Sequence, residues 1–208
     1  MTGLTDAQVE RYSRQIILPD VGARGQERLL AARVTVAGTG TAAITTVTLL
    51  GRSGVGVLVV PAGMPALPEL SPDSRVARGA APDETADVLA AVSADDAASA
   101  ALGRRAAEAR RPLVLGTLRG PRVTVATLVG RPCIACVALD GPSAGPDAGP
   151  LAAPAELALG ALAATEVLRV LLRSGGPGRV TTLAVDSGTS RAVEPAPTVG
   201  CRLCGEAA

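Results

Sequence analysis

Apolar residues gather in short runs that are separated by glycine- and proline-rich stretches along the chain. The first clear pattern is a β-branched run at 33–37, a glycine turn at 38–43, an apolar helix at 43–51 and a second apolar run at 55–60. A strand, a glycine turn, a helix and a second strand in this order form a βαβ unit, the beginning of a Rossmann-type sheet. The pattern therefore predicts an α/β fold whose mostly parallel sheet is flanked by helices.

The same reasoning continues along the chain and predicts one domain over residues 1–208. Helices are expected at 6–15, 25–32, 94–110 and 154–173, with Asp6, after Thr5, as the N-cap of the first. Strands are expected at 87–92, 112–116 and 122–129. A C-terminal hairpin is expected to pair 180–185 with 190–193. Two stretches rich in Pro, Gly and Ala lack periodicity, and we expect a loop at 61–82 and a linker at 140–154.

The turn after the first strand fits the GxGxxG/A pattern through Gly38, Gly40 and Ala43. The first glycine permits the tight turn, the second lets a phosphate approach backbone N–H groups, and Thr41 follows at the positive end of the helix. Gly38, Gly40 and Thr41 are therefore the candidate cofactor-binding residues. The second strand, however, ends without the carboxylate that holds ribose in dinucleotide sites. Two interpretations stay open: the turn still binds a nucleotide, or it persists as folding geometry after loss of the ligand.

Four cysteines form two pairs of identical spacing, Cys133-x-x-Cys136 and Cys201-x-x-Cys204, and the chain has no others. Doubled CxxC is typical of a tetrahedral zinc site with four thiolate ligands. Because the pairs lie far apart in sequence, one shared ion would join the middle of the chain to its C-terminal part. Four protein ligands leave no open position, so such a site is structural and not catalytic. Two disulfides or four buried thiols are the alternatives.

Composition excludes several kinds of catalysis. The chain contains no His, Lys, Asn, Phe or Trp, and Tyr12 is its single aromatic residue. A histidine-based acid–base or triad mechanism and a Schiff-base lysine are therefore excluded, and the metal interpretation leaves no free thiol as a nucleophile. Hydrophobic residues make up 48% of the chain, so we expect a globular core filled by Val, Leu, Ala and Ile.

Charge and hydropathy bear on partners and compartment. The net charge of +1 argues against a nonspecific nucleic-acid binder, and we interpret the basic cluster of Arg104, Arg105, Arg110 and Arg111 as a solvated helix face and end. No apolar run approaches the length of a membrane span, and residues 1–15 lack a signal-peptide core. We therefore expect a cytoplasmic protein, and that reducing compartment favours thiolate–metal bonds over disulfides.

Several segments, taken in chain order, are similar to the motifs of one protein family. They are the Arg-Tyr-x-Arg-Gln sequence within 10–18, the Gly-Gln pair at 25–26 with its following leucines, the strand and turn at 33–43, the segment 53–56, the cysteine pairs within 131–136 and 201–205, and the helix at 157–172. Together they resemble the MoeB/ThiF/HesA adenylyltransferases, the bacterial relatives of ubiquitin-activating enzymes.

The resemblance implies binding of ATP and adenylation of the C-terminal glycine of a small ubiquitin-fold carrier protein. It implies that the glycine turn cradles phosphates, that an Asp after the second strand holds ribose, and that an Asn, an Arg and a Lys downstream grip the triphosphate. It also implies a further Asp that positions magnesium. The arginine of the opening motif, here Arg14 or Arg11, is expected to reach into the neighbouring subunit of a dimer.

The sequence departs from that pattern at the residues that carry the chemistry. Ala62 stands where the ribose Asp is expected, the segment 61–86 is far shorter than in the family, and the chain contains neither Asn nor Lys. Asp95 is a shifted candidate for the magnesium-positioning Asp, and the linker at 140–154 lacks a cysteine that could form a thioester. Single electrostatic donors are each worth roughly 10²–10³ in rate, so losing several should cost several orders of magnitude.

We therefore interpret the sequence as a degenerate member of the family that retains the fold, the opening motif and a structural zinc site, whereas binding of ATP and Mg²⁺ stays open. In this hypothesis the chain is a non-catalytic subunit or scaffold for a ubiquitin-fold carrier or a catalytic homologue, in a homo- or heterodimer. Arg14, or else Arg11, would then complete the partner's site. Local salt bridges of both arginines are the alternative.

Three other functions are compared with this hypothesis. The first is an active ATP-dependent adenylyltransferase that acts on the C-terminus of a ubiquitin-like sulfur carrier or precursor peptide and uses arginine in place of lysine. The second is a module that binds a carrier or peptide without ATP, through the sheet edge and the linker at 140–154. The third, a nicotinamide-dependent oxidoreductase, is disfavoured because no ribose carboxylate and no proton donor accompany the glycine turn.

Overall fold

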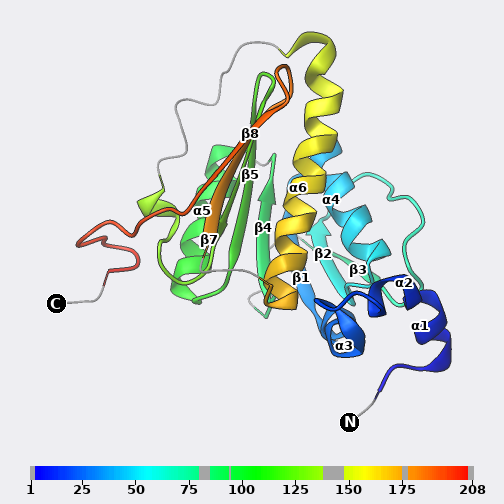
Figure 1. Ribbon diagram of the computed structural model, residues 1–208. Helices are drawn as coiled ribbons and strands as arrows, with labels where there is room; N and C mark the ends of the chain where they lie inside the picture. Colours follow the sequence, from blue (N-terminus) through cyan, green and yellow to red (C-terminus); the bar gives the residue numbers. More distant parts are fainter. Residues whose placement is uncertain (1–2, 80–84, 94, 138–147, 175–177, 206–208) are drawn as a thin grey trace.

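The computed structural model describes residues 3–79, 85–93, 95–137, 148–174 and 178–205, and it has a central sheet with helices on both faces (Figure 1). The elements follow one another as α1 (Asp6–Arg11), α2 (Ser13–Ile16), α3 (Gly22–Ala31), β1 (Arg33–Ala37), α4 (Thr41–Arg52), β2 (Val57–Pro61), β3 (Arg75–Gly79), β4 (Val88–Val92), α5 (Asp96–Glu108), β5 (Leu113–Arg119), β6 (Arg122–Leu128), η1 (Ile134–Cys136), η2 (Gly149–Leu151), α6 (Ala152–Leu172), β7 (Gly178–Ala184) and β8 (Thr189–Val193). The predicted βαβ unit is formed by β1, α4 and β2.

The sheet has a parallel half and an antiparallel half. Its strand order is β3-β2-β1-β4-β5-β6-β7-β8. Neighbours from β3 to β5 pair in parallel, and neighbours from β5 to β8 pair antiparallel. The order of the parallel half, 3-2-1-4-5, is that of a Rossmann-type sheet. The predicted α/β class and the C-terminal hairpin of β7 and β8 are thus confirmed, and the antiparallel half makes the sheet a mixed one.

Helices cover the two faces of the sheet unequally (Figure 1). The helices α4 and α6 pack side by side on one face, and α5 lies on the other. Side chains along β1 alternate accordingly, since Val34 and Val36 belong to the larger core cluster beneath α4 and α6. The smaller cluster lies on the α5 face and includes Leu102 and Leu115. Each face of the central strands is therefore covered by apolar side chains.

The segment 61–82 is not a loop throughout, as its lack of periodicity predicted. Residues 75–79 form β3, which pairs in parallel with β2, while residues 80–82 lie outside the described part of the chain. This edge strand contains two arginines among five residues, so its conformation depends on pairing with β2 and not on a pattern of its own. Before it, Leu67 and Leu70 pack against the core cluster beneath α4.

Several element boundaries also differ from the sequence-based expectation: the helix expected at 6–15 is divided into α1 and α2, α3 begins three residues earlier, and β5 ends three residues later. Thr5, not Asp6, is the N-cap of α1, because its hydroxyl accepts the backbone N–H of Gln8 at 3.3 Å and the Gln8 side chain accepts the N–H of Thr5 at 3.1 Å. The linker at 140–154 ends earlier than expected, since α6 begins at Ala152; residues 140–147 lie outside the described part of the chain. Within the described ranges no helix has the length and hydropathy to cross a membrane.

The backbones of α4 and α6 approach each other closely at Gly160. A Cβ atom at this position would lie 2.6 Å from the carbonyl oxygen of Ala42, so only glycine fits. The hydroxyl of Thr46 donates to the carbonyl oxygens of both Gly160, at 3.1 Å, and Ala42, at 2.9 Å. A core of small aliphatic side chains leaves cavities unless its helices come close, and this contact brings them together.

A buried carboxylate fastens α6 to the antiparallel half of the sheet. Glu166 on α6 is 2% exposed. Its Oε2 accepts hydrogen bonds from Thr127 on β6 at 2.7 Å and from Arg169 at 2.9 Å, and its Oε1 accepts one from Nε of Arg179 on β7 at 2.9 Å. Burial opposes its ionisation, but the hydrogen bonds of Thr127 and Arg179 and the charge of Arg169 hold the pKa of Glu166 below its ordinary value.

Replacing Glu166 by Ala should lower the free energy of unfolding by about 3–5 kcal/mol, because the change removes one partner of a buried ion cluster. Urea unfolding at neutral pH measures this difference. Glu156→Ala is the matched control, since Glu156 lies on the same helix and has no ion-pair partner within the described residues. The control should change stability by less than about 0.5 kcal/mol.

The loss should also depend on pH. Because the pKa of folded Glu166 is lowered, its contribution is fully present above the ordinary glutamate pKa and is lost as the pH falls through the folded value. The stability difference between wild type and Glu166→Ala should therefore narrow in acid. A difference that stays constant with pH, or an equal loss in Glu156→Ala, would show that the cluster does not hold α6 to the sheet.

Candidate functional site

A pocket of about 590 Å³ opens at the carboxyl ends of β1, β2 and β4. Its lining includes Gly38 after β1, Pro61 at the end of β2 and Ser93 after β4, while residues of α5 form one wall. The strand order reverses between β1 and β4, and open α/β sheets bind their ligands in the crevice at such a switch point. The volume is that of a small-molecule site.

The two glycines of the turn have different reasons to be glycine. Gly38 has a φ of +113°, and a Cβ there would lie 2.1 Å from the carbonyl oxygen of Val92, so the fold itself requires glycine. Gly40 has an ordinary φ of −78°, and a Cβ there would meet nothing within 4 Å. Of the three predicted cofactor-binding residues, Gly38 lines the pocket, whereas Gly40 and Thr41 follow it as the N-cap and first residue of α4.

The described lining residues bring one cation and one carboxylate to the pocket, Arg105 and Asp95. Asp95 also caps α5, since its Oδ1 accepts the backbone N–H of Ala98 at 2.7 Å. At the end of β2, Ala62 is an exposed turn residue whose N–H donates to the carbonyl oxygen of Gly79 at 3.1 Å. The position expected to hold ribose therefore offers no side chain that could accept a hydroxyl hydrogen bond.

The arginines that could replace a phosphate-binding lysine have different surroundings. Arg78 on β3 donates to the carbonyl oxygens of Met64 and Pro65, and it thereby closes the turn after β2. Arg105 lines the pocket, whereas its place in the sequence predicted a solvated arginine on the helix face. The spacing of residues 98, 101, 102 and 105 on one face of α5 is the signal that could have placed it there.

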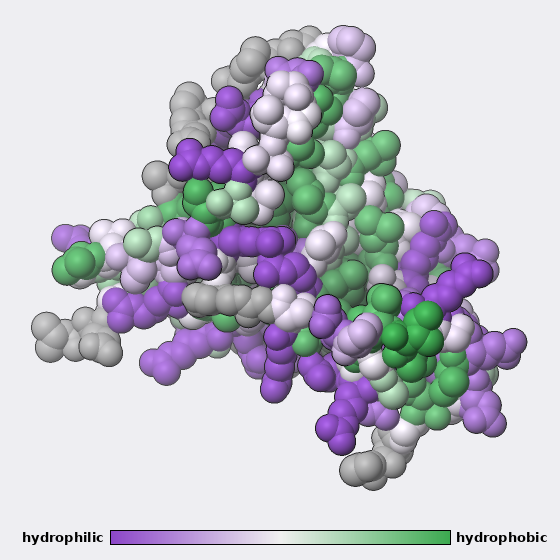
Figure 2. All heavy atoms as spheres, in the orientation of Figure 1, coloured by the Kyte–Doolittle hydropathy of each residue, from purple (hydrophilic) through white to green (hydrophobic). Residues whose placement is uncertain are grey.

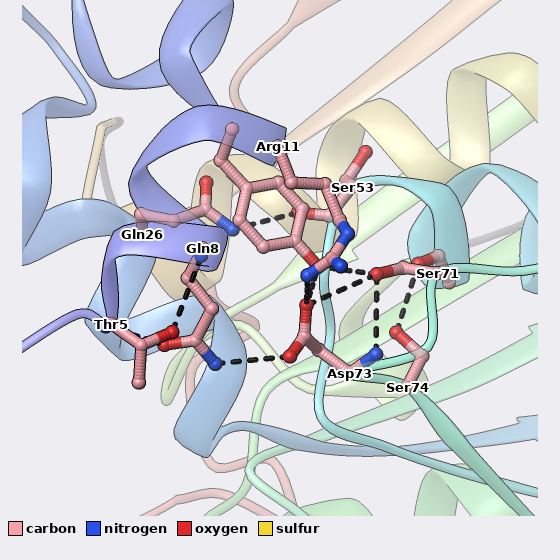
Figure 3. A network of polar contacts seen from close by, with 10 residues as sticks. Thr5, Gln8, Arg11, Gln26, Ser53, Ser71, Asp73 and Ser74 are labelled. Atoms are coloured by element: carbon pink, nitrogen blue, oxygen red, sulfur yellow. Dashed lines mark hydrogen bonds and ion pairs between the residues drawn. The ribbon is translucent and has the colours of Figure 1, made fainter.

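The two arginines of the opening segment, Arg11 and Arg14, also differ in their surroundings. The Nη1 atom of Arg11 lies 2.6 Å from Oδ2 of Asp73, which belongs to the stretch before β3 (Figure 3). Between them Tyr12 is 1% exposed, and its hydroxyl lies 3.0 Å from the Asp73 carboxylate and 2.5 Å from Oγ of Ser71. Arg14 is exposed on α2, and in the described part of the chain it has no ion pair. Arg11 thus has an intramolecular partner, and Arg14 stays the candidate for contact with another subunit.

The pKa shifts of Tyr12 and Asp73 are those of a network that stabilises the fold. Burial raises the pKa of Tyr12 above its ordinary value. Burial also opposes ionisation of Asp73, but the hydrogen bonds of Gln8 and Tyr12 and the charge of Arg11 hold the pKa of this carboxyl below its ordinary value. At neutral pH the network is therefore an ionised carboxylate held by a neutral phenol and a guanidinium, which ties the N-terminal helices to the segment before β3.

The four cysteines converge on one point. Their sulfurs all lie within 4.8 Å of one another. The Sγ–Sγ distances are 4.0 Å for Cys133–Cys136, 3.7 Å for Cys133–Cys201 and 3.5 Å for Cys136–Cys204. A disulfide bond is about 2.05 Å long, so none is formed. A tetrahedron with metal–sulfur bonds of about 2.3 Å has edges of about 3.8 Å, which matches these distances.

Two tight turns present the sulfurs to this point. In the first, the N–H of Cys136 donates to the carbonyl oxygen of Cys133 at 2.9 Å; in the second, the N–H of Gly205 donates to that of Cys201 at 2.6 Å. A Cβ at Gly205 would lie 2.3 Å from that oxygen, so the second turn needs glycine. Burial raises the pKa of Cys133 to about 12, and a thiolate there needs a nearby cation. The cluster could therefore hold a metal ion.

Short stretches of the chain match curated proteins, while no family model matches it. The vegetative HesA protein of Trichormus variabilis is 44% identical over 63 residues, which cover 30% of this chain and 24% of that protein. The SAMP-activating enzyme E1 of Haloferax volcanii is 49% identical over 61 residues, covering 29% and 23%. The probable adenylyltransferase/sulfurtransferase MoeZ of Mycobacterium tuberculosis is 44% identical over 57 residues, covering 27% and 14%. The matched stretches thus span at most about a quarter of these relatives.

The fold matches solved structures over nearly the whole chain. The crystal structure of E. coli MccB with ATP has a TM-score of 0.71 at 16% identity, and the match covers 94% of this chain and 74% of that one. MccB with MccA-N7isoASN gives a TM-score of 0.72 at 18% identity, covering 94% and 75%. At such identities the likeness concerns the fold alone. The local matches to HesA, the SAMP-activating enzyme and MoeZ, together with this fold, make the chain similar to the MoeB/ThiF/HesA family.

Proposed function

We propose that the chain is a degenerate member of the ubiquitin-like-carrier activating superfamily, acting as a non-catalytic subunit or scaffold for a ubiquitin-fold carrier or a catalytic homologue. One observation carries this proposal. The pocket at the switch point keeps the glycine turn, but its described lining provides a single cation, Arg105, and a single carboxylate, Asp95. The fold resembles that of the family, and the described lining of the pocket has few of the groups that would hold a nucleotide.

The charge requirement of adenylyl transfer supports this conclusion. A triphosphate bound with magnesium needs several positive groups to stabilise the charge that moves in the transition state. Without Lys, the chain can supply only arginines, and Arg78 is already bound to the carbonyl oxygens of Met64 and Pro65. Asp95, the candidate to position magnesium, is bound to the N-terminus of α5. Arg105, the one cation in the described lining, would have to replace an Asn, an Arg and a Lys.

The surface around α2 supports association with another subunit. Figure 2 shows an apolar patch over the N-terminal helices, where Val9, Ile17 and Leu18 are large exposed hydrophobic residues. Arg14 lies on the same short segment and is exposed beside them. An exposed apolar patch beside a cation without an intramolecular ion pair is typical of an interaction site. In this proposal a second subunit covers the patch, and Arg14 reaches into that subunit's pocket.

An active adenylyltransferase is the second candidate, and the openness of Gly40 favours it. The fold does not require glycine at this position, yet the space that a side chain would occupy is left free beside the N-terminus of α4. A phosphate needs such space to reach backbone N–H groups. In that case Arg105 and Asp95 would grip the nucleotide and its magnesium, and the substrate would be the C-terminus of a ubiquitin-like sulfur carrier or precursor peptide.

The four cysteines are proposed to hold a structural Zn²⁺ ion. All four ligand positions would be filled by Cys133, Cys136, Cys201 and Cys204, so the ion would have no open position for substrate. Its contribution would be to hold the segment after β6 against the C-terminal turn. Copper and iron–sulfur clusters also take thiolates, and four sulfurs around one point suit either zinc or an iron–sulfur site; the doubled CxxC spacing favours zinc.

We expect no heat of binding when ATP and Mg²⁺ are titrated into the protein in a calorimeter, and no carrier-dependent exchange of pyrophosphate at high protein concentration. The missing cations and ribose carboxylate are the reason. The control variant is Arg104→Ala, because Arg104 is exposed and lies outside the pocket lining. If ATP binds with micromolar affinity, and this binding is lost in Arg105→Ala and kept in Arg104→Ala, the active adenylyltransferase becomes the favoured function.

The role of Arg14 is tested by reconstitution with a full-length catalytic homologue. If the chain completes its partner's site, Arg14→Ala should lower the partner's rate of adenylation by about 10²-fold, the worth of one electrostatic donor. Arg24→Ala, an exposed arginine on α3, is the control and should leave the rate unchanged. Equal rates with wild type and Arg14→Ala would eliminate action across the interface.

Elemental analysis of protein purified without chelators should find one zinc ion per chain. Cys136→Ser and Cys204→Ser should each abolish stoichiometric zinc, because a serine hydroxyl is a poor replacement for a thiolate. Ala135→Ser places a hydroxyl in the same turn without touching a ligand and should keep the ion. Wild-type protein without metal, whose four thiols react freely with a thiol reagent, would refute the zinc proposal.

A further inference from the structure

A second pocket, of about 580 Å³, lies on the α5 side of the sheet beside the cysteine cluster. Its floor is apolar and consists of Ala106 on α5, Leu113 on β5 and Leu128 on β6, each at most 4% exposed. One wall is formed by Pro132 to Ile134, and another by Leu203 to Gly205. These walls carry one cysteine from each pair, so the cluster stands between the pocket's two walls.

The rim of this pocket carries charge of one sign. Arg110, Arg111 and Arg131 line it, and within the described lining there is no Asp or Glu. None of the three arginines has an ion-pair partner among the described residues. The whole chain has a net charge of only +1, so three arginines around one cavity, without an acidic residue in its described lining, are a local concentration of positive charge. Such a rim attracts anions.

The end of α5 explains only part of this cluster. Arginines near a helix C-terminus interact favourably with its partial negative charge, and Arg110 and Arg111 follow α5 directly. Arg131, however, comes from the segment between β6 and η1, so no helix end accounts for it. Arg110 also has a left-handed backbone with φ of 51°, where glycine is the usual residue after a helix. An arginine in this left-handed conformation is less favourable than glycine would be.

The apolar floor is held open by a contact from the cysteine turn. Ile134 lies against Gly103 on α5, where a Cβ atom would come within 2.4 Å of its Cδ1. Ile134 therefore packs on the helix next to the pocket and fixes the distance between the wall and α5. The result is an apolar cavity with a cationic mouth, whose size is that of a small-molecule site.

We propose that this pocket binds a small amphipathic anion, with its apolar body on the floor and a carboxylate or phosphate group between the arginines. The guanidinium fork matches both groups in geometry. The site is distinct from the pocket at the switch point, which shares none of its lining residues. Anion binding at this site requires neither ATP nor adenylation. The proposal can therefore be tested independently of the function proposed above.

The probes are monomeric decanoate and decyl phosphate, titrated into ¹⁵N-labelled protein and followed by NMR. Either acid should shift the amide signals of Leu128, Gly130 and Ile134 in a saturable way, and decyltrimethylammonium, with the same chain and the opposite charge, should not. A stronger response to one acid identifies the preferred headgroup. Binding of neither acid, equal binding of the cation, or shifts confined to Gly38 and Ser93 in the other pocket would overturn the proposal.

Variants separate the charge from the packing. Arg110→Ala and Arg131→Ala should each weaken binding about tenfold, the worth of one charge-assisted hydrogen bond at a partly exposed site. Arg131→Lys keeps the charge and should weaken binding less than Arg131→Ala. Arg191→Ala on the exposed strand β8 is the control and should bind as wild type does. Unchanged affinity in Arg110→Ala and Arg131→Ala, with melting temperatures that confirm folding, would refute the arginine site.

Discussion

The close approach of α4 and α6 determines how the core of this protein is packed. A core without Phe or Trp must be filled by small aliphatic side chains, and these reach native density only if the helices come close. Gly160 permits that approach, because any side chain there would strike the carbonyl of Ala42. The helix α4 begins at the glycine turn, and α6 carries Glu166. One contact between backbones therefore positions both the pocket at the switch point and, through Arg179, the antiparallel half of the sheet.

The glycine turn contains one glycine that the fold requires and one that it does not, and a sequence motif cannot distinguish them. Gly38 is required by its positive φ and by the carbonyl of Val92, so a chain that lost its ligand would still need it. Gly40 has no such requirement, and two causes are compatible with a glycine there: a ligand that approaches the backbone, and its position as the N-cap of α4. Persistence of Gly38 is therefore weak support for nucleotide binding, and Gly40 is the residue that keeps the enzymatic alternative in consideration. The missing carboxylate at Ala62 weighs against it.

Much of the fold could be predicted from local patterns, and much of the site could not. The strand at 33–37 was predicted to the residue, because a β-branched run before a glycine turn is a local signal. The strand β3 was missed because its conformation depends on pairing with β2. The hydrogen bond between Tyr12 and Asp73 likewise joins residues that are far apart in the chain, and no local sequence pattern predicts it. The doubled CxxC was informative since its spacing is a local geometric requirement, whereas Arg105 reached its pocket through the orientation of a whole helix.

The cysteine cluster links the segment after β6 to the segment after β8, beyond the pairing of both strands with β7 in the sheet. Residues after β6 and residues near Cys201 come from segments separated in sequence by α6 and the hairpin, and the four sulfurs bring these segments together. A metal ion there would do more than stabilise the fold, because the same segments form the two walls of the arginine-rimmed pocket. Metal binding and anion binding would then be thermodynamically linked: an ion that fixes the walls pre-organises the cavity, and a ligand that spans the walls favours the metal-bound form by the same free energy.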